Sequence, residues 1–191
     1  KLYKQSKFFD LAKQYGCGPR KGDALSKVKG SFQKMDGEFP LFAQLQQDTL
    51  RFAERYGYVE TMPDRSVCAE RWYPILASRT EDGRVNPTTP FNYRISGTAM
   101  QCTNKGMHRT TDQIDEWNND GSGWDGYLSL QIHDELLFDF PRGIGPEPWL
   151  TNMEKAMVIK ELMQMSGDDI GIPTPVSVTY HSETWATGIA M

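Results

Sequence analysis

The run from Tyr127 to Phe140 constrains the fold of this chain more than any other segment. Apolar and polar side chains alternate along it, which is typical of strands with one buried face. The polar break His133-Asp134-Glu135 divides the run in two and predicts a β-hairpin that turns there. The spacing predicts that one face carries the apolar side chains Leu128, Leu130 and Ile132, followed after the turn by Leu136, Phe138 and Phe140.

Helical patterns surround this hairpin. The apolar spacing predicts helices over 2–15, 40–56 and 97–117, and the capping box Thr151-Asn152-Met153-Glu154 predicts another that ends near Gly167. Ser96 is the expected N-cap of the third helix. Short strands are predicted at 58–62 and 176–180, and irregular chain at 63–90. The sequence therefore predicts an α+β fold in which long helices pack on a small antiparallel sheet.

Charge is distributed unevenly along the chain. Residues 1–34 hold nine basic and two acidic residues, whereas the remainder has 12 basic and 23 acidic ones. This asymmetry favours contact between the amino-terminal segment and a polyanion, although a solvated lysine-rich face gives the same pattern. No apolar run approaches the ~20 residues that a membrane span needs, so no membrane association is expected.

Three motifs could carry chemistry. The first is the predicted turn, because Asp134 and Glu135 offer the hard oxygen ligands that divalent cations prefer. The second is the helix face with Lys7 and Tyr15, where an amine suits a phosphate and a ring suits a base. The third is the segment 92–99, a polar approach to a helix N-terminus. Each has a plain structural alternative: a solvated turn, a half-exposed helix at a contact, and an ordinary helix cap.

In this order, the three motifs resemble the C-terminal part of a family A DNA polymerase, the group that includes bacterial DNA polymerase I and many phage replicases. Lys7 to Gly16 has the Lys-x7-Tyr-Gly spacing of the fingers helix, and Gln131 to Leu136 is similar to the Val-His-Asp-Glu motif of the palm. The segments 56–61, 96–99 and 176–185 are also similar to the family. The resemblance implies a fingers part at 1–85 and a palm part at 86–191, and we expect a polymerase of the phage type.

The resemblance also implies roles for individual residues. In the fingers, Lys7 would bind the triphosphate with Lys4 nearby, Tyr15 would lie at the insertion site, and Leu11 would replace the usual Phe or Tyr beside the sugar. In the palm, Asp134 would ligate two Mg²⁺ ions with Glu135 beside it, and His133 would touch the primer terminus. The implied DNA contacts are Asn92, Ser96 in place of the family's glutamine, Gln131, and one of Arg65 and Arg71.

The expected function is template-directed DNA synthesis by nucleotidyl transfer from a dNTP to a primer 3′-hydroxyl. The expected partners are primer-template DNA, dNTPs and an upstream polymerase portion. Because the chain opens Lys1-Leu2-Tyr3 inside a helical pattern, we expect a fragment that is inactive without the upstream metal-binding strand. The cysteines Cys17, Cys68 and Cys102 lack a Cys-x-x-Cys pair, which favours a reducing compartment: the cytoplasm of a bacterial or phage-infected cell. A metal-dependent phosphoesterase and a catalytically incomplete nucleic-acid-binding module remain alternatives.

Overall fold

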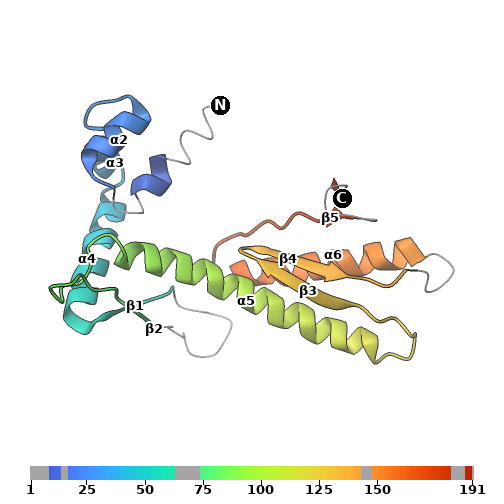
Figure 1. The fold of residues 1–191 in the computed structure, drawn as a ribbon. Helices are drawn as coiled ribbons and strands as arrows, with labels where there is room; N and C mark the ends of the chain where they lie inside the picture. The colour runs from blue at the N-terminus through green and yellow to red at the C-terminus, as the bar shows by residue number, and fades with distance from the viewer. Residues whose placement is uncertain (1–8, 14–16, 63–73, 143–147, 182–187, 191) are drawn as a thin grey trace. The chain divides into compact units, whose positions relative to one another are not determined.

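The computed structural model describes residues 9–13, 17–62, 74–142, 148–181 and 188–190 (Figure 1). These residues fall into two compact units. Unit 1 draws on Lys1–Met62 and Trp72–Thr98, and unit 2 on Pro63–Arg71 and Ala99–Met191. Helices and small antiparallel sheets occur in the described chain, which confirms the predicted α+β class.

The first half of unit 1 is helical. Residues 9–13 form a helical turn, and three helices follow: α2 (Pro19–Ser26), α3 (Ser31–Glu38) and α4 (Pro40–Tyr56). The predicted bounds of α4 are confirmed. The helix ends at Gly57, which has a left-handed φ of 79° that glycine adopts without strain. The Gly57 amide donates a hydrogen bond to the Ala53 carbonyl at 2.8 Å.

A short sheet completes unit 1. Strand β1 (Tyr58–Glu60) pairs antiparallel with β2 (Pro74–Leu76), with Val59 opposite Ile75. The core of the unit consists of four buried side chains: Ala53, Val59, Ala77 and Val85. Strand β2 lies where the sequence predicted irregular chain, and that prediction is wrong at this point. The segment is extended because β1 supplies a hydrogen-bonding partner, which local composition does not reveal.

Helix α5 (Pro90–Asn118) is longer than its apolar stripe predicted. It begins at Pro90, whose fixed φ suits the first position of a helix and whose missing amide costs no hydrogen bond there. Ser96 consequently lies inside the helix, and its predicted role as N-cap is wrong. The first turns of α5 belong to unit 1 and the following turns to unit 2.

Unit 2 is built around the predicted hairpin. Strands β3 (Tyr127–Ile132) and β4 (Glu135–Asp139) pair antiparallel, which confirms the hairpin. Helix α6 (Pro148–Asp168) begins before the predicted capping box, so Thr151 is an interior residue of the helix and the box does not start it. The chain ends in a second pair, β5 (Thr179–Tyr180) with β6 (Ile189–Ala190).

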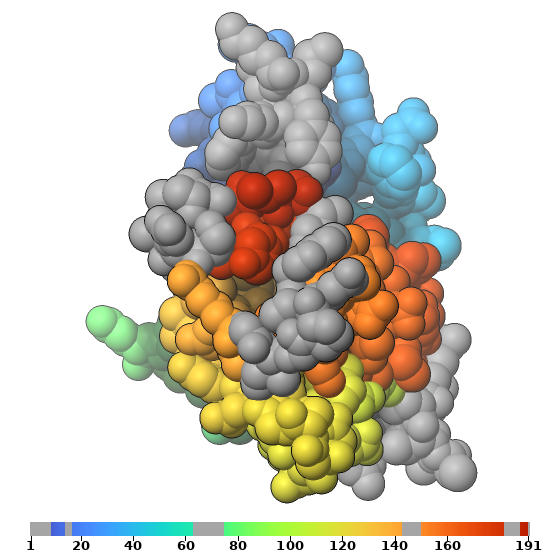
Figure 2. Space-filling model, turned by 90° about the vertical axis from the view of Figure 1, so that its right-hand side faces the viewer, coloured from blue at the N-terminus to red at the C-terminus, as the bar shows by residue number. Residues whose placement is uncertain are grey.

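One hydrophobic core joins the elements of unit 2. Ile114 of α5, Trp124 and Ile159 of α6 are buried together, and Phe138 and Phe140 of the hairpin pack against them. In Figure 2 the end of α5 and the hairpin, in yellow, lie directly against α6, in orange. The hairpin is therefore held on a helical support rather than projecting as an isolated ribbon.

A bulge alters the predicted faces of the hairpin. Leu128 pairs with Phe138 and Leu130 pairs with Leu137, so the register shifts between Leu128 and Leu130. Cross-strand partners share a face of a sheet. Leu128 therefore lies on the face opposite that of Leu130, and the predicted grouping of these two side chains is wrong.

Two further features of the described residues are the hydropathy of the helices and the state of the cysteines. Among the helices in the described chain, none combines the length and apolar character that a bilayer span requires. Cys17 and Cys102 are half-buried and form no disulfide with each other, and Cys68 lies outside the described residues.

Candidate active site

A two-residue turn forms the tip of the hairpin. Ile132 pairs with Glu135, which leaves His133 and Asp134 as the turn. His133 has a φ of 55°, a left-handed conformation that is uncommon for residues other than glycine but several-fold enriched for Asn, Asp and His. The backbone of the motif therefore reverses direction at the histidine, and Asp134 follows it at the exposed tip.

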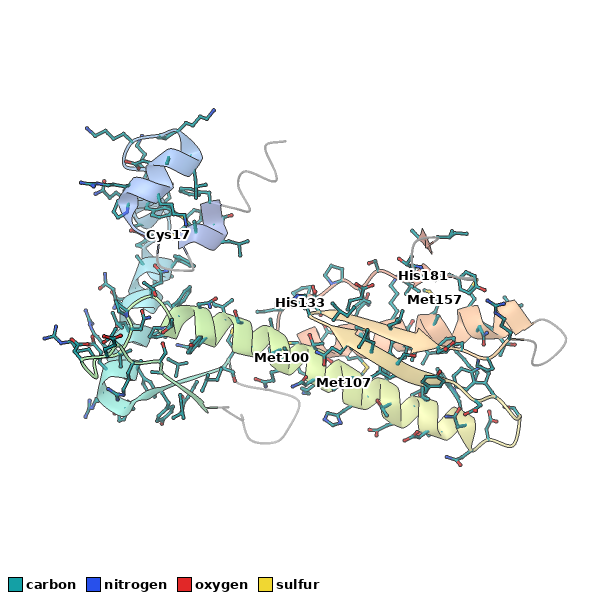
Figure 3. All side chains as sticks on the ribbon, viewed as in Figure 1. Cys17, Met100, Met107, His133, Met157 and His181 are labelled. Atoms are coloured by element: carbon teal, nitrogen blue, oxygen red, sulfur yellow. The ribbon has the colours of Figure 1, made fainter. Side chains whose placement is uncertain are left out.

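Gln131 holds this turn in place. Its Nε2 donates a hydrogen bond to the His133 carbonyl at 3.2 Å and lies 3.6 Å from Sδ of Met100 on α5. Figure 3 labels Met100 on α5 and His133 at the tip. The DNA contact of Gln131 stays a prediction, and in the structure this side chain links the turn to the helix.

Asp134 and Glu135 present two carboxylates to solvent. Both side chains are exposed, and neither has a hydrogen-bond or ion-pair partner among the described residues. Glu135 is the first residue of β4 and shares its face with Ile132, whereas Gln131 pairs with Leu136 on the other face. The two carboxylates are free to bind a cation, and their hard oxygens suit Mg²⁺.

The described residues do not enclose a metal by themselves. No group of three or more His, Cys, Asp or Glu side chains suited to hold a metal ion occurs within the described ranges. A metal ion at the hairpin tip would therefore need further ligands from outside these residues.

The predicted DNA contacts Asn92 and Ser96 lie together on the first turns of α5. Ser96 Oγ and Asn92 Oδ1 are 3.1 Å apart, with the hydroxyl as donor. Ser96 is exposed and Asn92 half-buried, so both polar groups are accessible in unit 1. Their four-residue spacing on a helix explains the contact.

Leu11 lies on the helical turn 9–13, and its side chain is half-buried. Two contacts fix this turn to α3: the Phe9 and Phe32 rings are 4.9 Å apart, and Lys13 Nζ lies 2.7 Å from Asp36 Oδ1. The other predicted residues of this group, and both candidate arginines, lie outside the described residues: Lys4, Lys7, Tyr15, Arg65 and Arg71.

Sequence reasoning missed two residues that position the start of α5. Thr98 is 5% exposed; its Oγ1 accepts from the Met62 amide at 3.0 Å and donates to the Arg94 carbonyl at 2.7 Å. Arg94 Nη1 lies 3.4 Å from Thr49 Oγ1 of α4, and both residues line a small pocket of about 160 Å³. Arg94 and Thr98 lie within the segment 92–99, but the sequence does not reveal their contacts with Thr49 and Met62, which are distant in the chain.

Comparison with known proteins identifies a family. The family model described as DNA polymerase family A matches residues 2–187. A search of curated proteins finds no match to the chain.

Proposed function

The chain belongs to DNA polymerase family A, and from that premise we propose that it carries out template-directed DNA synthesis, in which a nucleotide is transferred from a dNTP to a primer 3′-hydroxyl. The observation that supports this most directly is the tip of the hairpin. Two exposed carboxylates lie at this tip: Asp134 in the turn that Gln131 ties to α5, and Glu135 directly after it. A rigid support with free hard oxygens is what metal-assisted phosphoryl transfer requires.

We assign Mg²⁺ to this tip, with Asp134 as the principal ligand and Glu135 beside it. Bound Mg²⁺ supplies neutralisation of phosphate charge and activation of the primer hydroxyl. Asp134 lies in the turn, whereas Glu135 is constrained by its pairing with Ile132. Asp134 is therefore the carboxylate that can approach substrate most freely.

His133 is assigned to the primer terminus, next to the metal ligands. The tether from Gln131 fixes its backbone carbonyl, so the imidazole is presented from a defined turn. On the nucleotide side, Lys7 with Lys4 is assigned to the triphosphate and Tyr15 to the insertion site. Leu11 would face the sugar with an aliphatic side chain in place of a ring.

Contacts to primer-template DNA are assigned to polar side chains of both units. Asn92 and Ser96 form an accessible polar pair on α5, and Gln131 retains hydrogen-bonding capacity at its amide oxygen. One of Arg65 and Arg71 would contact the primer strand.

Completion of the site would require a carboxylate from a second strand. Two-metal transfer would need carboxylates from more than one element, and the hairpin tip offers two adjacent ones. We propose that an upstream polymerase portion, from the same gene or a separate subunit, supplies this strand, and that the assembly works in the cytoplasm.

The test is primer extension with Mg²⁺ and all four dNTPs. The 191-residue chain is assayed by itself and mixed with a separately expressed upstream portion of the same polymerase. Templated extension that appears on mixing and disappears with EDTA is expected. Mixtures that hydrolyse phosphoesters without a template, or that only bind DNA, would contradict the proposed function.

A further inference from the structure

The open end of the hairpin is held by the core of unit 2. Phe138, next to that end, and Phe140 pack against a buried cluster that includes Ile114 of α5. His133 and Asp134 form the turn at the opposite end of the hairpin. The core therefore fixes the open end of the hairpin, and the tip needs a separate support.

A bulge separates the anchored end of the hairpin from the tip. The register of the two strands shifts between Leu128 and Leu130, and a bulge bends and twists the strand that carries it. Beyond the bulge, Leu130 is 49% exposed, and His133 and Asp134 at the tip are exposed as well. Packing at the open end therefore does not set the direction of the tip.

A side-chain hydrogen bond joins the tip to α5. Gln131 Nε2 lies 3.6 Å from Met100 Sδ and 3.2 Å from the carbonyl oxygen of His133. A side-chain amide has two N–H groups, so it can donate one to the thioether and one to the carbonyl. The sulfur of Met100 thereby fixes the direction in which the amide of Gln131 points.

The hydrogen bond to the His133 carbonyl bears directly on Asp134. The carbonyl of His133 and the amide of Asp134 belong to the same peptide group, which is planar. His133 has a φ of 55°, a left-handed conformation that side chains with a Cβ disfavour. The bond from Gln131 holds this peptide group in its orientation, and the direction of the Asp134 side chain follows from it.

We propose that Met100 is a positioning residue of the candidate active site: through Gln131 it sets the direction of the Asp134 carboxylate. This inference rests on the proposed function, in which Asp134 binds Mg²⁺. Catalysis depends on close alignment, and a misplacement of about 1 Å costs up to about 100-fold in rate. Met100 acts through Gln131 and is not assigned to the metal or the substrate.

The first test measures primer extension by the complete polymerase. Met100→Leu keeps the volume of the side chain and removes the sulfur acceptor. We expect kcat to fall about fivefold to tenfold and the Mg²⁺ concentration for half-maximal extension to rise, with the KM for dNTP nearly unchanged. Met107→Leu on the same helix is the matched control and should change none of these quantities. Among the described residues, Met107 accepts hydrogen bonds at its carbonyl and none at its sulfur.

Two further variants separate positioning from loss of packing. Met100→Gln places an acceptor oxygen near the position of the sulfur and should recover most of kcat. Met100→Leu combined with Gln131→Leu should be no slower than Gln131→Leu alone, because Met100 acts through Gln131. Urea unfolding of each variant reports whether unit 2 is folded. Additive losses in the double variant, or no recovery in folded Met100→Gln, would overturn the proposal.

A second readout does not depend on synthesis. In the 191-residue chain, the backbone amide signal of Asp134 in a heteronuclear NMR spectrum reports the peptide group that Gln131 holds. Met100→Leu should shift this signal, Met100→Gln should return it toward its original position, and Met107→Leu should leave it in place.

An unchanged Asp134 signal in folded Met100→Leu would also overturn the proposal. A complete polymerase that does not extend primers would count against the proposed function alone. The amide signal of Asp134 would then still decide whether Met100 positions this turn.

Discussion

The ammonium nitrogen of Lys155 on α6 lies 4.1 Å from the centroid of the Trp117 ring and 4.7 Å from that of Trp124. The two indoles meet edge to face at 5.6 Å, and Trp124 is 2% exposed. Indole is the strongest cation–π partner among the side chains. Lys155 therefore joins α6 to the end of α5 and to the loop before the hairpin, and supports the core on which the candidate active site rests.

Truncation of Lys155 should destabilise unit 2. We expect Lys155→Ala to lower the free energy of unfolding by about 1–2 kcal/mol, because both ring contacts and the packing of the aliphatic stem are lost. Urea unfolding followed by tryptophan fluorescence measures this loss. Lys160→Ala on the same helix is the control, since no ring contact involves Lys160 among the described residues. Equal losses in the two variants would contradict the assigned role.

The same lysine should make stability depend on alkaline pH. Burial lowers the pKa of Lys155 below its ordinary value of 10.5, while Asp120 acts in the opposite direction. Between the lowered pKa and 10.5 the unfolded chain binds more protons than the folded one, so the contribution of this group to stability rises with pH. Relative to Lys155→Met, the original chain should gain stability between neutral pH and pH 10.5. A difference that stays constant over this window would refute the expectation.

Gly97 should not tolerate a side chain. An added Cβ would collide with Ile75 Cδ1 and lie 3.2 Å from Thr61 Cγ2, so Gly97→Ala should cost about 1–3 kcal/mol by overpacking. Gly37→Ala is the matched control, because a Cβ there meets nothing within 4 Å and alanine favours a helix by about 1 kcal/mol. Chemical denaturation of both variants checks the opposite signs. A Gly97→Ala variant with a higher free energy of unfolding than the original chain would contradict the close approach of α5 to β2.

Loss of the carboxylate at the turn should stop synthesis. In the complete polymerase, Asp134→Asn is expected to abolish extension and to leave primer-template affinity nearly unchanged, because it removes a metal ligand and no phosphate contact. Glu135→Gln should have a smaller effect. Extension rates and DNA affinities are compared with those of Asp125→Asn, an exposed aspartate in the preceding loop. Near-normal extension by Asp134→Asn at saturating Mg²⁺ would contradict the assignment of the metal site to this hairpin.

Leu11 should govern acceptance of altered sugars. A leucine offers neither a hydroxyl nor a flat face to the sugar. The ratio of dideoxynucleotide to deoxynucleotide incorporation should therefore be lower for the original chain than for Leu11→Tyr. Competition between the two nucleotide types in the complete polymerase measures the ratio, with Leu11→Met as a control of similar volume. Identical ratios in the original chain and Leu11→Tyr would show that this position does not contact the sugar.

Features set by neighbouring residues were predictable from the sequence. Helix α4 ends where Gly57 permits a left-handed φ, and the hairpin turns where polar residues interrupt alternating apolar ones. The adjacency of Asp134 and Glu135 at its tip follows from the same pattern. These features depend on contacts within a few residues, which amino-acid order alone specifies.

Features set by distant partners were not predictable. The extension of helix α5 back to Pro90 carries Phe91, which packs on Phe42, and Arg94, which bonds to Thr49, and these contacts join residues far apart in the chain. Strand β2 exists because β1 lies beside it, and the bulge near Leu128 regroups side chains that alternation had placed on one face.

The sequence by itself determined the family pattern, the class of the fold and the order of Gln131, His133 and Asp134, because motifs and local hydrogen bonds need no knowledge of distant contacts. Only the tertiary structure decided that Gln131 ties the turn to Met100, and that a buried Phe32 joins α3 to the turn with Leu11. Both depend on side chains brought together from separate elements, and the packing energy that selects such pairs is defined only once the whole core has formed.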